Sequence, residues 1–361
     1  MEYKTFLDEL LKRKDKVFEY LSSSRFQEMF KPEHVRDSVY SYVKQRGKYL
    51  RPALLLFSCG AVGGDEEKAI PAAAAVEVFH TLTMVHDDII DRDSKRRGGP
   101  TVHEEFRRKA ISELGYDEHE ARHYGISMAI LAGDMQQGWA VSMLSELSSQ
   151  DGIDPNLVLY LIKDLEMRIQ STLIEGQMLD IQYSKLPIDS LNQEQILDML
   201  WKKTGALFEF PSKAGAMLGL NTIDPEHQLV RAISSFAGKC GIAFQLQDDI
   251  LGIIGDEATL GKPVGSDIRE GKRTIVLYQS LKNASSKQKN QLMEIYGSEQ
   301  ADDQDIEKAK ALLQELGGIE YAKEVARSYL KDSLAHLQKV PQSKYKNLLF
   351  AWADYMIERE F

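Results

Sequence analysis

Residues 71–91 read PAAAAVEVFHTLTMVHDDIID, an apolar stretch that ends in three aspartates. A proline followed by strong helix formers predicts a helix that begins near Pro71. Asp87 and Asp91 are four residues apart, so on a helix their carboxylates share one face, a turn apart, while Asp88 is rotated off that line. Like charges in this arrangement repel one another, which favours a cation bound between them.

A second aspartate pair, Asp248 and Asp249, lies in the apolar segment FQLQDDILG. Carboxylates are costly to bury unless something positive meets them. Two such clusters facing each other would form an oxygen-rich pocket suited to Mg²⁺, which in proteins usually carries substrate phosphates. The alternative is a solvated acidic helix end, and the short DDxxD pattern does not exclude it.

The composition bounds the possible classes of protein. With 361 residues, 43% of them hydrophobic, the chain can build a sizeable core in one domain or two. No apolar run reaches the ~20 residues of a membrane span, and the charged start MEYKTFLDELLKRKDK lacks a signal-peptide core, so we expect a cytoplasmic protein. The net charge of −10 argues against a general nucleic-acid binder. Cys59 and Cys240 lie in apolar stretches without CxxC spacing, which predicts core residues and neither a zinc site nor a disulfide framework.

Nearly every segment of the chain is predicted to be helical. Four further stretches are long, apolar and free of strand-like alternation: 124–144, 158–183, 196–220 and 227–254. A loop rich in Gly, Lys and Asp follows over 255–274, and more helices follow from about Ile275, with a charged connector near Gly297 to Asp305. Glycines recur inside the helices, and since glycine costs roughly 1 kcal/mol against alanine, they predict close packing or room for a ligand. We predict one all-α domain over residues 1–361.

Basic residues lie near both acidic clusters and inside two apolar segments. They are Lys48, Arg51, Arg96, Arg97, Lys202, Lys203, Lys262 and Lys272. Arginine offers phosphate oxygens a planar fork and lysine offers them a point charge. Each residue alone is more readily a surface charge. Together with the two acidic clusters they predict two diphosphate sites, one reached through metal and one directly.

The sequence resembles the trans-isoprenyl diphosphate synthases, the polyprenyl synthetase family. Five segments match in the family's order between Gly47 and Thr274: GKYLRP, HTLTMVHDDIIDRDSKRRGGPTVH, KKTGALFE, FQLQDDILG and LGKPVGSDIREGKRT. The resemblance implies the isoprenoid synthase fold, a single large bundle of antiparallel helices around a deep central cavity. It also implies a homodimer.

The resemblance implies roles for individual residues. It implies three Mg²⁺ ions held by Asp87, Asp91 and Asp248, with Asp88 and Asp249 in support. Arg96, Lys203 and Lys262 would grip the allylic diphosphate, and Lys272 would close over the metal-bound site. The pocket for isopentenyl diphosphate would be formed by Lys48, Arg51, His80 and Arg97. Thr204 and Gln245 would lie beside the allylic carbocation and, with Lys203, form the catalytic set. One departure is Gly252, which stands where the second motif would have its final aspartate.

The activity implied is that of a trans-prenyltransferase. It would join isopentenyl diphosphate head to tail to dimethylallyl, geranyl or farnesyl diphosphate through Mg²⁺-assisted ionisation, and release diphosphate. No side chain is an evident general base, so we expect the departing diphosphate to accept the proton. His80 lies two helical turns before Asp87 on the same face, within reach of a substrate diphosphate, whereas His86 is interpreted as structural.

The residues beneath the first aspartates predict the product length. The growing tail would run from Asp87 toward the start of its helix and meet Thr83 and Leu82 and then Phe79. One helical turn, ~5.4 Å, is close to the reach of one isoprene unit. A large aromatic residue at position 82 or 83 would stop the tail early, so Leu82 and Thr83 predict C20 to C25 products with Phe79 as the floor. Products of C30 or longer are the alternative, and plain core packing is the alternative role of these side chains.

Three other functions are less consistent with the sequence. A class I terpene cyclase would use the acidic motifs but would not need Lys48, Arg51 and Arg97. A non-catalytic partner subunit would usually lack one aspartate motif, and both are present. A helical scaffold protein would explain the helices but not the order of the charged segments.

Overall fold

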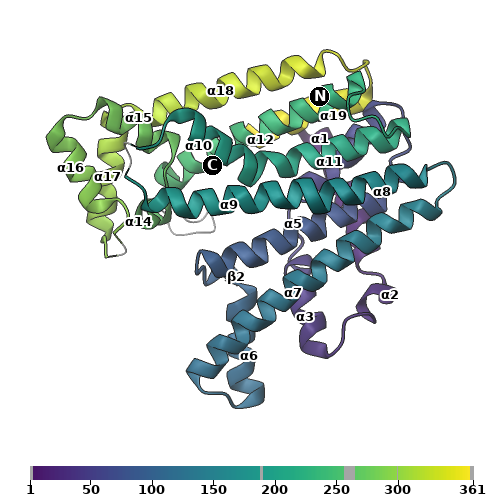
Figure 1. The fold of residues 1–361 in the computed structure, drawn as a ribbon, viewed down its shortest axis with the longest axis horizontal. Helices are drawn as coiled ribbons and strands as arrows, with labels where there is room; N and C mark the ends of the chain where they lie inside the picture. The colour runs from purple at the N-terminus through teal and green to yellow at the C-terminus, as the bar shows by residue number, and fades with distance from the viewer. Residues whose placement is uncertain (1–2, 188–189, 256–264, 299, 358–361) are drawn as a thin grey trace. The chain divides into compact units, whose positions relative to one another are not determined.

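A computed structural model describes residues 3–187, 190–255, 265–298 and 300–357. In these residues the predicted all-α fold is confirmed (Figure 1). The strands described are β1 (Lys95–Arg96) and β2 (Gly99–Pro100), which pair antiparallel. The deep central cavity stays a prediction.

The chain divides into two compact units, which are described separately. The first comprises Met1–Lys163, Pro211–His227 and Gln342–Leu349. The second comprises Asp164–Phe210, Gln228–Pro341 and Phe350–Phe361. Whether these units are one domain, as predicted from the sequence, stays a prediction.

The first unit is arranged around α5. Its helices are α1 (Tyr3–Leu21), α2 (Ser24–Gln27), α3 (Glu33–Lys44), α4 (Leu50–Ala61), α5 (Ile70–Ile90), α6 (Val102–Leu114), α7 (Glu118–Glu146) and α8 (Pro155–Lys163), and a 3₁₀ turn spans Leu147–Ser149. Helix α5 packs against α1, α4 and α7. Helices α5 and α7 can be followed in Figure 1. Pro71 is its second residue, as the sequence predicts, and the alanines of 72–75 are completely buried. Only small side chains fit this crowded first turn of α5.

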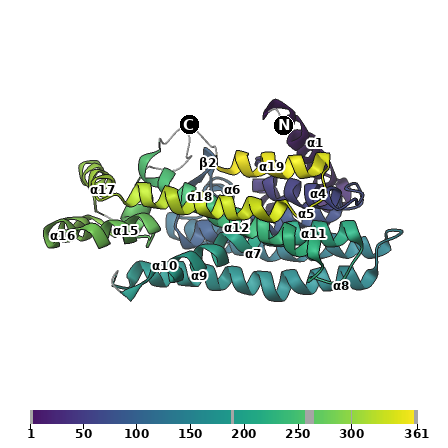
Figure 2. The ribbon, with the colours of Figure 1, turned by 90° about the horizontal axis from the view of Figure 1, so that it is seen from above.

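The second unit is arranged around α12. Its helices are α9 (Gln170–Lys185), α10 (Gln193–Leu200), α12 (Gln228–Ile254), α14 (Ser266–Glu270), α15 (Ile275–Asn283), α16 (Ser286–Ile295), α17 (Asp303–Glu315) and α18 (Gly318–Leu337). Helix α18 runs along α12 in both views (Figures 1 and 2). Leu246, Ile250 and Ile253 of α12 share a buried core with Ile275 and Leu277 of α15. The Thr274 side chain accepts a hydrogen bond from the Leu277 backbone, which caps α15 where the glycine-rich segment ends.

Two helices are divided between the units, and two segments are π-helical. Helices α11 (Ala206–Leu220), with Pro211 inside it, and α19 (Lys344–Ile357) each contribute residues to both units. The π-helical segments are Asp164–Ile169 and Trp201–Gly205. Such segments are rare and occur often at functional sites. The second one carries Lys203 and Thr204.

The glycines inside the helices allow close packing, as predicted. A Cβ atom at Gly133 of α7 would collide with the His86 ring of α5. At Gly176 of α9 it would collide with the backbone of Lys203. His86 therefore contacts a neighbouring helix, which fits its interpretation as a structural residue.

The structure refines the prediction in two places. Residues 255–274 were expected to be a loop, but a short helix, α14, lies inside this segment. The turn that carries Arg97 is the two-residue loop of a β-hairpin formed by β1 and β2. Arg97 and Gly98 in this loop both adopt positive φ angles, of 52° and 77°. This is the pattern of a type I′ turn, which closes two-residue hairpin loops.

Two predictions from composition also hold for the described residues. Cys59 and Cys240 are free and buried. In the part of the chain that the structure describes, none of the helices has the length and apolar character to cross a bilayer.

Candidate active site

The first aspartate cluster lies at the C-terminal end of α5. The backbone of Asp91 donates a hydrogen bond to the Asp87 carbonyl at 2.8 Å, so the two residues are one helical turn apart as their spacing predicts. Both side chains are half-buried. Their carboxylates can therefore meet a ligand from the surface of the first unit.

Asp88 has different surroundings from its two neighbours. It is completely buried and accepts hydrogen bonds from the Tyr42 hydroxyl of α3 and from Nε of Arg96, the latter at 2.6 Å. Burial raises the pKa of Asp88, although the Arg96 guanidinium and Tyr42 act in the opposite direction. Its predicted metal-supporting role stays a prediction, and in this structure both carboxylate oxygens are engaged by protein groups.

The hairpin after α5 presents the two predicted arginines. Arg96 is mostly buried and also lies 3.9 Å from Asp87, while Arg97 is exposed at the tip. A Cβ atom at Gly47 would lie 2.6 Å from Nη1 of Arg97. The glycine of GKYLRP therefore leaves space for the Arg97 side chain, and this segment meets the hairpin within the first unit.

The GKYLRP segment places Arg51 against His80. Tyr49 adopts a left-handed conformation, with φ of 56°, immediately before α4. Nη1 of Arg51 lies 3.0 Å from Nε2 of His80. Burial, together with Arg51 and Arg97, holds the pKa of His80 well below its usual range. The neutral imidazole therefore accepts a hydrogen bond from Arg51 and fixes the direction of its guanidinium.

A buried acid, Glu77, lies near these cations. It is 5% exposed, on α5, one turn before His80. Burial raises the pKa of Glu77 to about 7, and Arg97, Arg51 and Lys14 limit the rise. Glu77 is a functional candidate that sequence reasoning missed. The signal was a glutamate in the otherwise apolar first half of α5, residues 70–79.

The second cluster joins α12 to the π-helical segment Trp201–Gly205. The Thr204 hydroxyl donates to Oε1 of Gln245 at 2.8 Å, and Nε2 of Gln245 donates to Oδ1 of Asp249 at 3.0 Å. Burial, with the negative charge of Asp267 next in importance, raises the pKa of Asp249 to about 8. Within the described residues Oδ2 of Asp249 is buried without a hydrogen-bond partner, whereas Asp248 is half-buried.

The two predicted lysines of the π-helical segment differ in their partners. Lys202 pairs with two exposed carboxylates, those of Glu175 and Asp198, at the surface. Nζ of Lys203 lies 2.6 Å from the Asp180 carboxylate, which is only 13% exposed. Although burial acts to raise it, Lys203 and Lys272 hold the pKa of Asp180 below its usual range. Sequence reasoning missed Asp180. An aspartate inside a helix predicted to be apolar could have been singled out in the same way as Lys203, which is a lysine inside an apolar segment.

Asp267 was also missed and lies next to the atypical Gly252. A Cβ atom at Gly252 would lie 2.6 Å from Oδ2 of Asp267. Nζ of Lys272 is 3.0 Å from Oδ1 of Asp267 and 3.1 Å from Glu270. The Asp267 carboxylate thus occupies the space beside position 252. The predicted Lys262 lies outside the described residues.

The carboxylates fit a hard cation in their chemistry. Each cluster offers oxygen ligands, and the unpartnered Oδ2 of Asp249 is an acceptor without a donor among the described residues. No group of three or more His, Cys, Asp or Glu residues in the described ranges is arranged to hold a metal alone. Mg²⁺ is usually bound by one or two carboxylates and completed by waters and substrate phosphates.

The predicted chain-length residues lie on α5 beneath Asp87. Phe79 and Leu82 are buried, and Thr83 is half-buried with its hydroxyl donating to the His80 carbonyl. They lie on the side of α5 toward its N-terminus, where the prediction places the tail. Their role in product length stays a prediction.

Comparisons with known proteins show which sequences and structures this chain resembles. The polyprenyl synthetase family model matches residues 32–313. A geranylgeranyl diphosphate synthase of Saccharolobus solfataricus is 36% identical over 298 residues, which are 82% of this chain and 81% of that protein. A geranylfarnesyl diphosphate synthase of Aeropyrum pernix is 32% identical over 91% of this chain and 95% of that protein. The crystal structure of a geranylgeranyl pyrophosphate synthetase from Pyrococcus horikoshii has a TM-score of 0.82 at 33% identity and covers 100% of both chains.

Helices that carry aspartates beside arginines and lysines define an all-α protein suited to binding diphosphate. More particularly, the chain belongs to the polyprenyl synthetase family.

Glu77 predicts a specific pH dependence of stability. Its folded pKa of about 7 lies above the ordinary value of 4.5, so the native state retains a proton that the unfolded state loses. The free energy of unfolding of the wild type should therefore fall as pH rises from 4.5 to about 7. Glu77→Gln removes this titration, so its stability relative to the wild type should rise by up to about 3 kcal/mol over that range.

Urea unfolding at pH 5, 6, 7 and 8 measures this difference. Glu324→Gln, at an exposed position of α18, is the matched control. A constant difference between Glu77→Gln and the wild type at all four pH values would contradict the prediction.

Proposed function

We propose that this chain is a trans-prenyltransferase that condenses isopentenyl diphosphate with an allylic diphosphate and releases diphosphate. The observation that carries the proposal is the grouping within the first unit. There, Arg96 lies 3.9 Å from Asp87 near the end of α5, Asp91 follows one helical turn later, and Arg51 of α4 contacts His80 of α5. Membership of the polyprenyl synthetase family and the activities named for the relatives support it.

The first step breaks the allylic carbon–oxygen bond and leaves negative charge on the diphosphate. Preorganised donors aimed at such developing charge are usually the largest contribution to catalysis. Arg96, held by Asp88, and Lys203, held by Asp180, are donors of this kind. Magnesium ions, three in our proposal, would be held by Asp87, Asp91 and Asp248 and would neutralise the diphosphate charge.

The carbocation that remains needs nearby electron pairs and no water. The Thr204 hydroxyl donates its hydrogen bond to Oε1 of Gln245, so the lone pairs of the hydroxyl oxygen are available to the cation. The apolar residues of α5 would enclose the tail and exclude water. His80 is neutral and accepts from Arg51, so we assign the final proton to the departing diphosphate.

We propose products of C20 to C25. The relatives include both geranylgeranyl and geranylfarnesyl diphosphate synthases. Positions 82 and 83 hold Leu and Thr, which leave the upper part of the predicted tail path free of aromatic side chains. Phe79, buried one turn deeper, would form the floor.

The wild-type protein tests the activity directly. Incubation with isopentenyl diphosphate and farnesyl diphosphate in the presence of Mg²⁺ should extend the chain by one or two C5 units, as read by chromatography of the dephosphorylated products. Chelation of Mg²⁺ with EDTA should abolish the reaction. Terpene hydrocarbon formed without isopentenyl diphosphate would instead identify a cyclase.

Leu82→Phe tests the tail path. The added aromatic ring should stop elongation early, so the main product from dimethylallyl diphosphate should shorten to C15. Phe79→Ala should lengthen it, because the floor is removed. An unchanged product distribution in both variants would place the tail elsewhere.

We also propose that the protein is a homodimer. On α9, Ile174, Met178 and Ile181 follow one another at helical spacing and are 56%, 48% and 40% exposed. On α7, Ile130, Leu131 and Met135 are likewise exposed. Contiguous apolar faces of this kind mark association surfaces in soluble proteins. A second copy of the chain would bury them.

Ile174→Asp should dissociate the dimer, because it places a charge in the apolar face of α9. Sedimentation velocity should show the loss as a lower mass at micromolar concentration. Leu11→Asp, at an exposed leucine of α1, is the matched control and should keep the wild-type mass. A wild-type protein that sediments as a monomer would refute the proposal.

A further inference from the structure

The middle aspartate of the first motif is completely buried and its carboxylate holds an arginine. Nε of Arg96 donates to Oδ1 of Asp88 at 2.6 Å, and Nη2 of Arg96 pairs with the same oxygen. The other oxygen, Oδ2, accepts from the Tyr42 hydroxyl. Hydrogen bonds to ionised groups are short and strongly directional. The carboxylate is therefore fixed from both sides.

Tyr42 is itself fixed by its surroundings. Its ring is 2% exposed and packs with Val85, Val102 and Phe106. Its hydroxyl oxygen accepts a hydrogen bond from the Val102 backbone at 3.3 Å, at the start of α6. The Val102 backbone therefore donates to the Tyr42 hydroxyl, and the Tyr42 hydroxyl donates to Asp88. Asp88 acts only as an acceptor and can also accept from Arg96.

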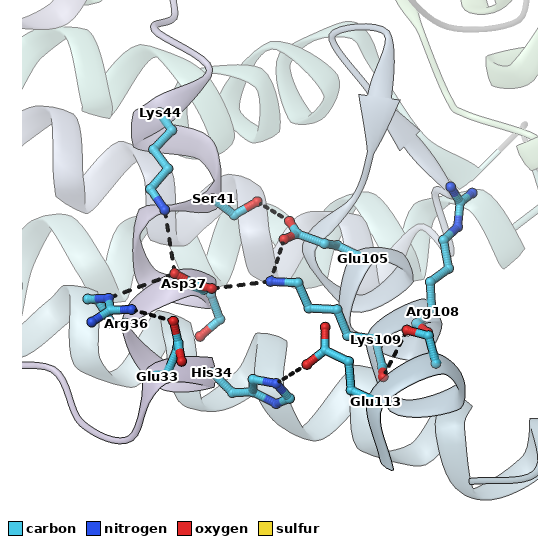
Figure 3. Close-up of polar contacts among 12 residues, drawn as sticks. Glu33, His34, Arg36, Asp37, Ser41, Lys44, Glu105, Arg108, Lys109 and Glu113 are labelled. Atoms are coloured by element: carbon cyan, nitrogen blue, oxygen red, sulfur yellow. Dashed lines mark hydrogen bonds and ion pairs between the residues drawn. The ribbon is translucent and has the colours of Figure 1, made fainter. Parts of the chain in front are cut away.

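A polar network holds α3, which carries Tyr42, against α6 (Figure 3). Lys109 of α6 pairs with Asp37 of α3 at 3.4 Å and with Glu105 at 3.2 Å. The Ser41 hydroxyl donates to Glu105 at 2.7 Å. Because Ser41 is next to Tyr42 in the chain, this contact sets the position of the tyrosine relative to the first turn of α6.

Arg96 needs such an anchor. It lies in a hairpin whose strands have two residues each, and isolated short hairpins are marginally stable. Its side chain is 17% exposed, so its charge requires a partner. Asp88 supplies that partner and defines the direction of the guanidinium.

We propose that Tyr42 is a positioning residue: it holds the Asp88 carboxylate, which in turn orients the Arg96 guanidinium toward the diphosphate. In this proposal Asp88 binds Arg96 and is not a ligand of the metal. The inference rests on the proposed function, in which Arg96 grips the diphosphate of the allylic substrate. Loss of the tyrosine hydroxyl frees the Asp88 carboxylate to rotate. Arg96 then loses its alignment, while Asp87 and Asp91 keep theirs.

The affinity of the protein for inorganic pyrophosphate in the presence of Mg²⁺, measured by calorimetry, tests this role without turnover. Tyr42→Phe should weaken it about tenfold. Tyr40→Phe is the matched control, because Tyr40 is a buried tyrosine of the same helix whose hydroxyl donates to the Leu21 carbonyl. It should lose similar thermal stability but keep wild-type pyrophosphate affinity. Equal affinities for Tyr42→Phe and Tyr40→Phe would overturn the proposal.

A double-mutant cycle shows whether Tyr42 acts through Arg96. In an Arg96→Gln background Tyr42→Phe should change pyrophosphate affinity less than twofold, because the group that it positions is absent. The same loss in both backgrounds would overturn the proposal.

Metal binding separates Asp88 from its neighbours. Electron paramagnetic resonance of Mn²⁺ with pyrophosphate should show Asp88→Asn retaining the bound ion and Asp91→Asn losing it. Equal loss in the two variants would overturn the assignment of Asp88.

A wild-type protein that binds pyrophosphate but forms no prenyl product would refute the proposed function alone, because the pyrophosphate and Mn²⁺ measurements do not need turnover.

Discussion

Buried charge must be paired, and this constraint determines one ion pair in each of the two units. Removing an ion from water is so costly that a buried carboxylate or guanidinium is stable only against an opposite partner or donors. In the first unit Asp88 meets this need with Arg96 and Tyr42. In the second unit Asp180 meets it with Lys203. Each pair fixes the direction of a cation, and the proposed binding of diphosphate requires such fixed cations before the substrate arrives.

Part of this arrangement could be predicted from the sequence because it depends on neighbours along the chain. The helix from Pro71, the turn between Asp87 and Asp91, and the helix that contains Asp248 follow from local composition and spacing. The ordered motifs then identify the family. Helical periodicity places Asp88 on a different face from Asp87 and Asp91, but it does not show that this face is buried and that Asp88 pairs with Arg96.

The rest depends on partners that tertiary structure supplies. Tyr42 lies in α3, 46 residues before Asp88, and nothing in its local sequence marks it as a partner. Lys202 and Lys203 are adjacent and look equivalent, yet only Lys203 meets a mostly buried carboxylate. The difference arises because adjacent residues of a helix point in different directions, so that Lys203 meets Asp180 of α9 and Lys202 meets acids at the surface.

Gly252 also shows that the sequence alone does not reveal which residues lie together in space. Read along the chain, it is a missing aspartate, and the second motif loses one carboxylate. In space, the Asp267 carboxylate lies where a side chain at position 252 would begin. A carboxylate at 252 would therefore meet a second one at close range, and like charges that cannot both be solvated destabilise each other. Glycine at 252 therefore leaves room for the Asp267 carboxylate, which lies beside this position of α12. The negative charge of Asp267 in turn contributes, after burial, to the raised pKa of Asp249.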